Sequence, residues 1–173
     1  MIEPLTAEAA RRERAALTSL LQDVVDDGAS VGFLPPLGAA EASRYWEGVA
    51  AAVGDGGRLL WGARDAGGDI VGSVQLDLEQ RANGNHRAEL AKLMVHTKAR
   101  RRGIGRRLML AAEAEARRRG RTTLVLDTRL GDPSELLYRS LGWEFAGSIP
   151  RYARSANGAL DANAIYYRLL DPA

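Results

Sequence analysis

The 173-residue sequence predicts an α/β fold in which parallel and antiparallel strands share one sheet. Two observations predict it. An apolar run at 89–96, a helix-period segment at 104–119 and a β-branched run at 122–128 follow one another closely, as in a strand–helix–strand unit with parallel strands. The runs at 59–64 and 70–79 flank the turn sequence DAGGD, which predicts an antiparallel hairpin.

Two helices are expected before the hairpin. Apolar residues at helical spacing run through 6–25, and the Asp-Asp-Gly sequence at 26–28 ends that helix. The sequence FLPP at 33–36 breaks the chain because proline cannot continue a regular element. A second amphipathic helix is predicted over 39–53, where a glycine-rich stretch follows it.

The remaining elements complete the sheet. A polar loop at 81–87 precedes the central strand. The sequence DPSE at 132–135 resembles a capping box with proline at the first helical position, and Gly142 closes the short helix that it begins. Strands are predicted at 143–148 and 164–170.

Composition sets limits on the class of protein. Hydrophobic residues make up 46% of the chain and charged ones 27%, so we expect a single domain over residues 1–173 with a real core. Cysteine is absent, which excludes disulfides, thiolate metal sites and a cysteine nucleophile. The sequence shows no signal-peptide pattern and no membrane-spanning run, so we expect a cytoplasmic protein that binds no membrane.

Arginine is concentrated between positions 100 and 121, although the net charge is only +2. A local basic patch on a nearly neutral chain indicates an anion site more than a nucleic-acid surface. A nucleic-acid-binding module would need salt-dependent affinity, and the arginine run lacks interleaved aromatic residues. We therefore expect no nucleic-acid partner.

The glycine turn RRRGIG lies where a phosphate would bind. A helix begins at Ile104, and a helix N-terminus offers unpaired N–H groups and the positive end of the helix dipole. Gly103 and Gly105 leave the backbone bare, and arginines surround them. The turn is neither a P-loop nor a dinucleotide fingerprint, because no Lys-Ser/Thr and no third glycine follow. Taken alone, it is also compatible with a tight connection that binds nothing.

The same residues resemble the GCN5-related N-acetyltransferases, whose acetyl-CoA loop reads Gln/Arg-x-x-Gly-x-Gly/Ala after a central strand. Arg100, Gly103 and Gly105 match that pattern, and LYRSLGW at 137–143 resembles the second signature of the family, which carries a tyrosine near the cofactor sulfur. The resemblance implies a mostly antiparallel sheet with helices on both faces, splayed at the central parallel strand pair to admit acetyl-CoA as co-substrate.

The resemblance also implies the cofactor residues. Backbone groups of the central strand bind the pantetheine arm and polarise the thioester carbonyl as an oxyanion donor would. The expected cofactor-binding residues are Leu93, Met94, Val95, Arg100, Arg101, Arg102, Gly103, Ile104, Gly105 and Arg106. No metal is expected, because His86 and His96 lack a matching ligand set.

Amine acetylation needs a base and an acid. An acceptor amine with a pKa near ~10 is neutral in only about one part in a thousand at pH 7, so a group must remove its proton. Glu89 opens the central strand and Asp127 ends its parallel neighbour, and we favour Asp127 because it aligns with the strand-end carboxylate of the family. The phenol of Tyr138 could protonate the departing thiolate. Each carboxylate could instead be a solvated strand end or loop cap, and Tyr138 could be a packing residue.

Several segments are similar to the tabtoxin-resistance acetyltransferases: DDGASVGF at 26–33, RAELAKLMV at 87–95, LDT at 126–128 and AIYY at 164–167. This likeness implies direct attack, in a ternary complex, by a small polar amine such as an amino-acid-like compound or an antibiotic or toxin. Acceptor recognition is expected from the loops at 26–36, 81–87 and 150–163. The sequence is equally compatible with a monomer and with a homodimer.

Two other functions stay open. One is acetylation of a protein N-terminus or peptide amine. The other is an acyl-CoA-binding sensor that catalyses no reaction, which the intact Tyr138 disfavours.

The sequence also departs from the family pattern at two positions. Gly131 stands where many members have a pantetheine-contacting asparagine. Trp143 stands where phenylalanine is commoner, and we expect packing to absorb that difference.

Overall fold

The computed structural model describes residues 1–171. In chain order, its elements are β1 (Ile2–Pro4), α1 (Ala7–Arg12), α2 (Arg14–Asp26), α3 (Ala39–Gly54), β2 (Arg58–Arg64), β3 (Ile70–Leu78), β4 (Arg87–Val95), the 3-10 turn η1 (Thr97–Ala99), α4 (Ile104–Arg118), β5 (Thr123–Arg129), α5 (Ser134–Ser140), β6 (Glu144–Arg154) and β7 (Leu160–Leu169).

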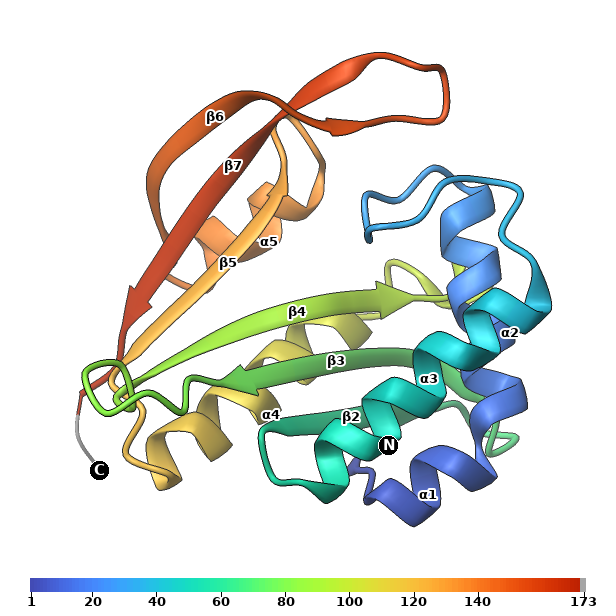
Figure 1. Cartoon of the computed structure of the whole chain (residues 1–173), viewed down its shortest axis with the longest axis horizontal. Coiled ribbons are helices and arrows are strands. Elements are labelled where there is room, and N and C mark those ends of the chain that lie inside the picture. The colour runs from blue at the N-terminus through green and yellow to red at the C-terminus, as the bar shows by residue number, and fades with distance from the viewer. Residues whose placement is uncertain (172–173) are drawn as a thin grey trace.

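One seven-stranded sheet organises the fold, with the strand order β1-β2-β3-β4-β5-β7-β6. Neighbouring strands are antiparallel except β4 and β5, which are parallel, so the predicted mixed sheet, hairpin and parallel unit are confirmed. The parallel pairing ends where Glu89 lies opposite Val125. Beyond that point the two halves of the sheet diverge (Figure 1), as the resemblance implied.

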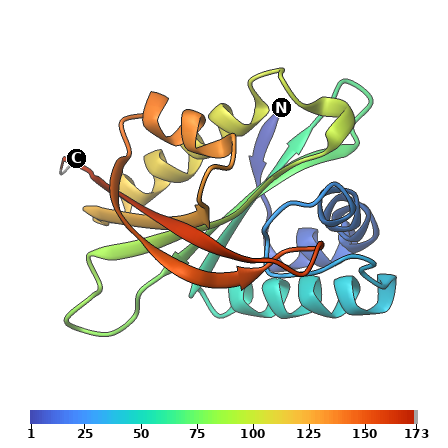
Figure 2. The ribbon, with the colours of Figure 1, turned by 90° about the horizontal axis from the view of Figure 1, so that it is seen from above.

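Helices cover both faces of the sheet (Figure 2). On one face α1, α2 and α3 bury an apolar layer that includes Leu21 and Trp46. On the other face α4 buries Leu108 and Met109 together with Tyr138 of α5. Each helix has one apolar side, and this arrangement buries that side against the sheet. It also leaves the N-terminus of α4 beside the point where the sheet opens.

The N-terminal prediction was only partly right. The expected helix over 6–25 is two helices, and Glu13 separates them with ψ near zero. Its carboxylate pairs with Arg64 of β2 at 2.9 Å. The short strand β1 was not predicted, since three residues give too little alternation to identify a strand. The helix over 39–53 is confirmed as α3.

The C-terminal strands are longer than predicted. The expected loop at 150–163 is largely strand, because β6 continues to Arg154 and β7 begins at Leu160. Strand β6 is an edge strand and is exposed along most of its length, so it lacks the apolar alternation that marks a half-buried strand. Pro150 is tolerated there because an edge strand need not donate every N–H, and the pairing register shifts beside it.

Candidate active site

The edge of β4 that faces β5 lacks a partner strand beyond Glu89. Within residues 1–171, pairing with β5 stops there, whereas β3 accompanies β4 on its other side up to Val95. Backbone groups of 90–95 that point toward β5 therefore need partners from outside the sheet. An extended ligand laid along this edge would supply those partners as an added strand does.

A β-bulge interrupts β4 beside the open edge. Lys92 and Leu93 lie opposite the single residue Val74 of β3, because the pairing register shifts there. Lys92 has φ 52°, in the left-handed region that a residue with a Cβ rarely adopts. Such strain persists only where the surrounding structure imposes it, and it is commonest at functional sites. The bulge changes the direction of the backbone N–H and C=O groups around Leu93 at the open edge of β4.

The loop at 96–103 joins β4 to α4 and is shaped to receive an anion. Arg101 and Gly103 both have left-handed φ values, 64° and 73°. Gly103 is the N-cap residue of α4, and no side chain caps its N–H groups. The 15-residue helix therefore presents unsatisfied donors and the positive end of its dipole to the loop. The predicted helix start at Ile104 is confirmed, and phosphate binding at this turn stays a prediction.

The two glycines of the turn serve different purposes. Only Gly103 needs a positive φ, and its missing Cβ faces open space. Gly105 is helical, and a Cβ there would lie 3.3 Å from Cδ2 of Leu137 on α5. Gly105 therefore permits α4 and α5 to pack closely, which places Leu137 on the cofactor cavity, while Tyr138, the next residue of α5, lines the inner cavity described below. The sequence analysis expected both glycines to leave the backbone bare; Gly103 does so at a positive φ, and Gly105 does so by allowing a close approach.

A cavity of about 610 Å³ opens between β4, the loop, α5 and the end of α2. Nine of the ten predicted cofactor residues line it, and Leu137 and Arg129 are among its other lining residues. The nine are Leu93, Met94, Val95, Arg100, Arg101, Gly103, Ile104, Gly105 and Arg106.

Arg102 is the exception. It lies on the wall of a different cavity of about 790 Å³, together with Lys98 and Arg107. Successive residues of a tight turn point in different directions, so consecutive arginines cannot all face one ligand. Arg102 therefore does not line the cavity that the other nine predicted cofactor residues line.

The three predicted catalytic residues come together. Glu89, Asp127 and Tyr138 line one cavity of about 160 Å³, which also includes Ser134 and Asp132. This inner cavity shares Ala29, Leu93, Asp132 and Ser134 with the cofactor cavity, so the two adjoin. Glu89 and Asp127 reach it from β4 and β5, the two strands that separate.

The electrostatics distinguish the two carboxylates. Burial raises the pKa of the Glu89 carboxyl, and the negative charges of Asp127 and Asp77 raise that pKa further. The cations Lys92 and Arg58 oppose the shift. Glu89 as a residue is exposed to solvent, so water limits the effect of burial on its pKa, and its carboxylate can exchange protons with a bound molecule. A carboxylate with a raised pKa is a better proton acceptor at neutral pH.

Tyr138 is buried between aromatic rings. Its ring centroid lies 6.4 Å from that of Trp143 and 6.0 Å from that of Tyr166. Burial raises the pKa of the Tyr138 phenol to about 12, with the charges of Asp132 and Asp127 acting in the same direction and Ser134 against it. The phenol therefore keeps its proton at neutral pH, as a proton donor must.

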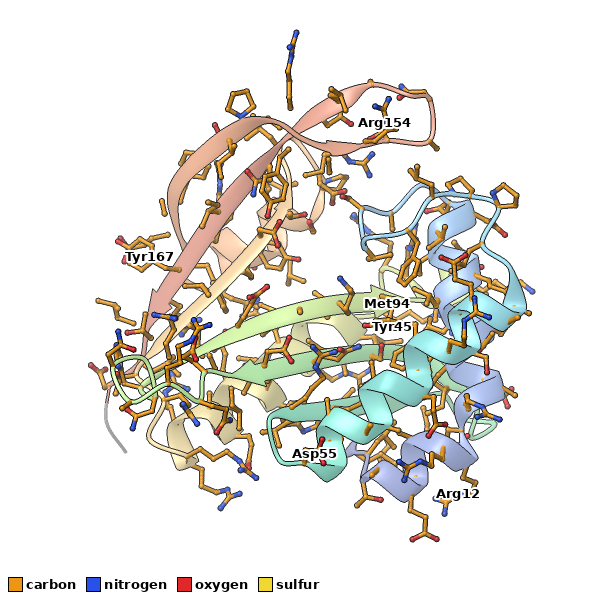
Figure 3. The ribbon with its side chains drawn as sticks, in the orientation of Figure 1. Arg12, Tyr45, Asp55, Met94, Arg154 and Tyr167 are labelled. Carbon is orange, nitrogen blue, oxygen red and sulfur yellow. The ribbon has the colours of Figure 1, made fainter. Side chains whose placement is uncertain are left out.

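A fourth, outer cavity of about 220 Å³ lies between the loop after α2 and the β6–β7 hairpin. Figure 3 labels Arg154 on that hairpin and Met94 on β4, in the other half of the sheet. Arg129 at the end of β5 lines both this cavity and the cofactor cavity. It donates to the carbonyl of Gly28 at 2.5 Å and to Oγ of Ser155 at 3.2 Å. Arg129 thus joins the two segments that wall the outer cavity.

Sequence reasoning missed Arg129. Its only signal was its position directly after the LDT segment at a strand end, where side chains meet the opening of a sheet.

The loop at 81–87, which was expected to recognise the acceptor, lies away from the candidate site. It joins β3 to β4 where the sheet halves converge (Figure 1), and Arg121 donates to its backbone. None of its residues lines any of the four cavities. The segments 26–36 and 150–163 do contribute walls.

The described residues contain neither a candidate metal site nor a membrane-spanning helix. Across residues 1–171, no group of three or more metal-ligating side chains comes together. No helix there has the length and apolar character to cross a membrane.

Comparison with known sequences identifies relatives. The sequence model of the acetyltransferase (GNAT) family matches residues 33–143. A protein from Azospirillum brasilense, described as an uncharacterized N-acetyltransferase in the hisH-hisA intergenic region, is 36% identical over 115 residues. That match covers 65% of this chain and 66% of the relative, so it spans slightly under two thirds of that protein's length.

Solved structures share the fold at low sequence identity. A ribosomal-protein-alanine N-acetyltransferase from Brucella melitensis has a TM-score of 0.78 at 22% identity, covering 98% of this chain and 99% of its own. A phosphinothricin acetyltransferase from Sinorhizobium meliloti, solved in complex with acetyl-CoA, has a TM-score of 0.78 at 20% identity, covering 98% and 88%. The fold is therefore common to proteins named for very different acceptors.

Proposed function

The chain belongs to the acetyltransferase (GNAT) family, and on that premise we propose that it transfers the acetyl group of acetyl-CoA to the amine of a small, amino-acid-like acceptor. Acyl-CoA-dependent N-acetyl transfer is the reaction class of the family, and acetyl-CoA is the co-substrate. The acceptor class, direct attack in a ternary complex and the residue roles are our assignments.

The open edge of β4 and the loop suit the two chemically different parts of acetyl-CoA. The amides of the pantetheine arm can pair with the backbone around Leu93 to Val95, where the sheet leaves donors and acceptors free. The pyrophosphate suits the uncapped N-terminus of α4 at Gly103, with Arg101 and Arg106 beside it. When bound, acetyl-CoA supplies an acetyl group activated as a thioester.

Glu89 is the proposed general base. Its carboxylate lies on the inner cavity that adjoins the cofactor cavity, and its pKa is raised by burial and by Asp127. It accepts a proton from the acceptor ammonium at a carboxylate oxygen, which frees the nitrogen lone pair for attack. Asp127, which the sequence favoured for this role, keeps the pKa of Glu89 high and attracts the ammonium.

Tyr138 is the proposed general acid. Its phenol remains protonated at neutral pH, because burial raises its pKa to about 12. It can donate that proton to the departing thiolate sulfur, and Leu137 against Gly105 fixes the helix that carries it. The backbone at the bulge would hold the negative charge on the carbonyl oxygen during attack.

The acceptor class follows from the charges of two adjoining cavities. The inner cavity is lined by the carboxylates of Glu89, Asp127 and Asp132 and by one cation, Lys92, so its net negative charge attracts an ammonium group. The outer cavity is lined by Arg129 and Arg154 and, within residues 1–171, by no carboxylate, although Asp132 and Asp161 each lie 3.9 Å from Arg129, and it shares Ala29 and Ser30 with the inner cavity. An amine with a carboxylate a few bonds away complements both. This adjacency of acidic and basic cavities is the observation that carries the proposal.

Two structural features disfavour a protein acceptor. The inner and outer cavities are small, at about 160 and 220 Å³. Arg129 also ties the loop after α2 to the β6–β7 hairpin, which would have to separate to admit a longer peptide. A tabtoxin-like acceptor, which the sequence suggested, stays a prediction within the amino-acid class.

A thiol-release assay with acetyl-CoA tests the acceptor class. Free amino acids and β-lactam amino-acid analogues should be acetylated, and their carboxamide derivatives should lose most of kcat/KM because Arg129 and Arg154 then lack an anion. Aminoglycosides, polyamines and short peptides complete the panel. Faster turnover of peptides than of amino acids would move the function to protein acetylation. Tight acetyl-CoA binding without turnover of any amine would favour the sensor.

A further inference from the structure

Helix α2 presents two carboxylates to the cofactor loop. Asp23 and Asp27 are four residues apart, so both lie on the same side of the helix. Asp23 contacts Thr97 at the start of the loop, and Asp27 contacts Arg100 in its middle. Neither contact involves the glycines or the N-terminus of α4. The loop is therefore held from behind by an element that precedes it by more than seventy residues in the sequence.

The contact between Asp23 and Thr97 is bidentate. The Thr97 N–H donates to Oδ2 of Asp23 at 2.8 Å, and the Thr97 hydroxyl donates to Oδ1 at 2.8 Å. The Asp23 side chain is only 20% exposed, so water competes weakly for it. Hydrogen bonds to a charged acceptor are stronger than neutral ones, and two of them on one residue fix orientation as well as distance. Nδ1 of His96 also lies 3.3 Å from Oδ2.

The contact between Asp27 and Arg100 is more exposed. Arg100 donates to Oδ2 of Asp27 at 2.5 Å and to the carbonyl of Val95 at 3.3 Å. About two fifths of each side chain in the pair is accessible to solvent, so the ion pair contributes little by itself. It does turn the first arginine of the run toward α2. Asp23 is thus the stronger of the two attachments.

We propose that Asp23 is a positioning residue for acetyl-CoA: through Thr97 it fixes the backbone of the loop at 96–103 in the shape that receives the pyrophosphate. The inference rests on the proposed placement of the pyrophosphate on this loop. Asp23 does not line the cofactor cavity, and its negative charge would repel a phosphate, so it acts through the loop and not by contact. Misplacing a backbone donor by a fraction of an ångström weakens every bond that it makes.

The experiment compares two donors that differ in the pyrophosphate. Acetyl-CoA contains it, whereas S-acetylpantetheine has the same thioester arm without the nucleotide. Dissociation constants for both are measured by calorimetry for the full chain and for Asp23→Ala. We expect Asp23→Ala to weaken acetyl-CoA binding about 10-fold, equivalent to about 1.4 kcal/mol, and to leave S-acetylpantetheine unchanged. The ratio of the two constants is insensitive to a partial loss of folded protein.

Two further variants sharpen the comparison. Asp26→Ala is the matched control, because Asp26 is an exposed carboxylate on the same helix whose side chain makes no hydrogen bond or ion pair within residues 1–171, and it should leave both constants unchanged. Thr97→Val keeps the N–H and the side-chain shape but removes the hydroxyl, so it should produce a smaller loss confined to acetyl-CoA.

The outcomes separate this inference from the placement of the cofactor. If the unmodified protein binds acetyl-CoA no more tightly than S-acetylpantetheine, the pyrophosphate placement fails and the role of Asp23 fails with it. If the unmodified protein prefers acetyl-CoA but Asp23→Ala weakens both donors equally, or neither, the placement stands and Asp23 has no positioning role.

Discussion

Nε1 of Trp143 donates a hydrogen bond to the carboxylate of Glu113 at 2.9 Å, and thereby joins the chain after α5 to the middle of α4. Glu113 is only 1% exposed and also pairs with Arg168 at 3.3 Å. A buried carboxylate needs such donors because burial removes its water. The expectation that tryptophan at this position differs from phenylalanine only in packing was therefore wrong.

Trp143→Phe should destabilise the protein by about 2 kcal/mol, because it leaves the buried Glu113 carboxylate short of one donor. Urea unfolding of both proteins measures the loss. Trp46→Phe is the matched control, since Trp46 is equally buried but its Nε1 has no hydrogen-bond acceptor among the described residues. If the two substitutions cost the same, the loss reflects side-chain volume and not the hydrogen bond.

Tyr138→Phe should lower kcat about 100-fold, because the thiolate would leave without a proton donor, while the affinity for acetyl-CoA changes little. Steady-state rates with the best acceptor, together with calorimetric binding of acetyl-CoA, measure the two effects. Tyr166→Phe is the control for loss of a neighbouring phenol and should leave kcat nearly unchanged, since the Tyr166 ring packs beside Tyr138 but does not line the inner cavity. An undiminished kcat in Tyr138→Phe would remove the phenol from the mechanism.

Asp127→Asn should move the acid limb of the kcat/KM profile to lower pH. The pKa of Glu89 is raised by burial and next by the charge of Asp127, so removing that charge lowers the pKa of Glu89 and keeps the base ionised in more acidic solution. Glu89→Gln should abolish the limb. A limb that persists in Glu89→Gln would mean that another group, such as Asp127, is the base.

Gly103→Val should abolish acetyl-CoA binding in a protein that still folds. Gly103 has φ 73°, and a β-branched residue would push the loop out of that conformation. Gly56→Val imposes similar backbone strain after α3, where φ is 79° and a Cβ also meets open space. Calorimetry should therefore show binding lost in the first variant and kept in the second. Retained affinity in Gly103→Val would contradict the placement of the pyrophosphate.

The sequence was informative wherever local patterning and local structure agree. The strand–helix–strand unit around α4 was identified because apolar period, turn residues and loop length all pointed to the same answer. Tyr138 was selected from a motif, and Glu89 and Asp127 were selected from their positions on two predicted parallel strands; all three meet at one cavity because β4 and β5 separate beside α5.

Contacts between distant segments could not be predicted. The attachment of Asp23 to Thr97, the bridge from Arg129 to Gly28 and the donor that Trp143 gives to Glu113 each join residues far apart in sequence. No periodicity encodes such pairs, since they depend on how whole elements pack. The direction of Arg102 was missed for a related reason, because the backbone angles of a turn decide where each of several consecutive arginines points.

The measurement that tests the central claim most directly is the initial rate of thiol release over a matrix of acetyl-CoA and acceptor concentrations, with mass spectrometry of the enzyme during turnover. Direct attack in a ternary complex, with Glu89 as base and Tyr138 as acid, predicts intersecting double-reciprocal lines and no acetylated enzyme. Parallel lines together with an acetyl group attached to the protein would show a covalent intermediate and would contradict the account.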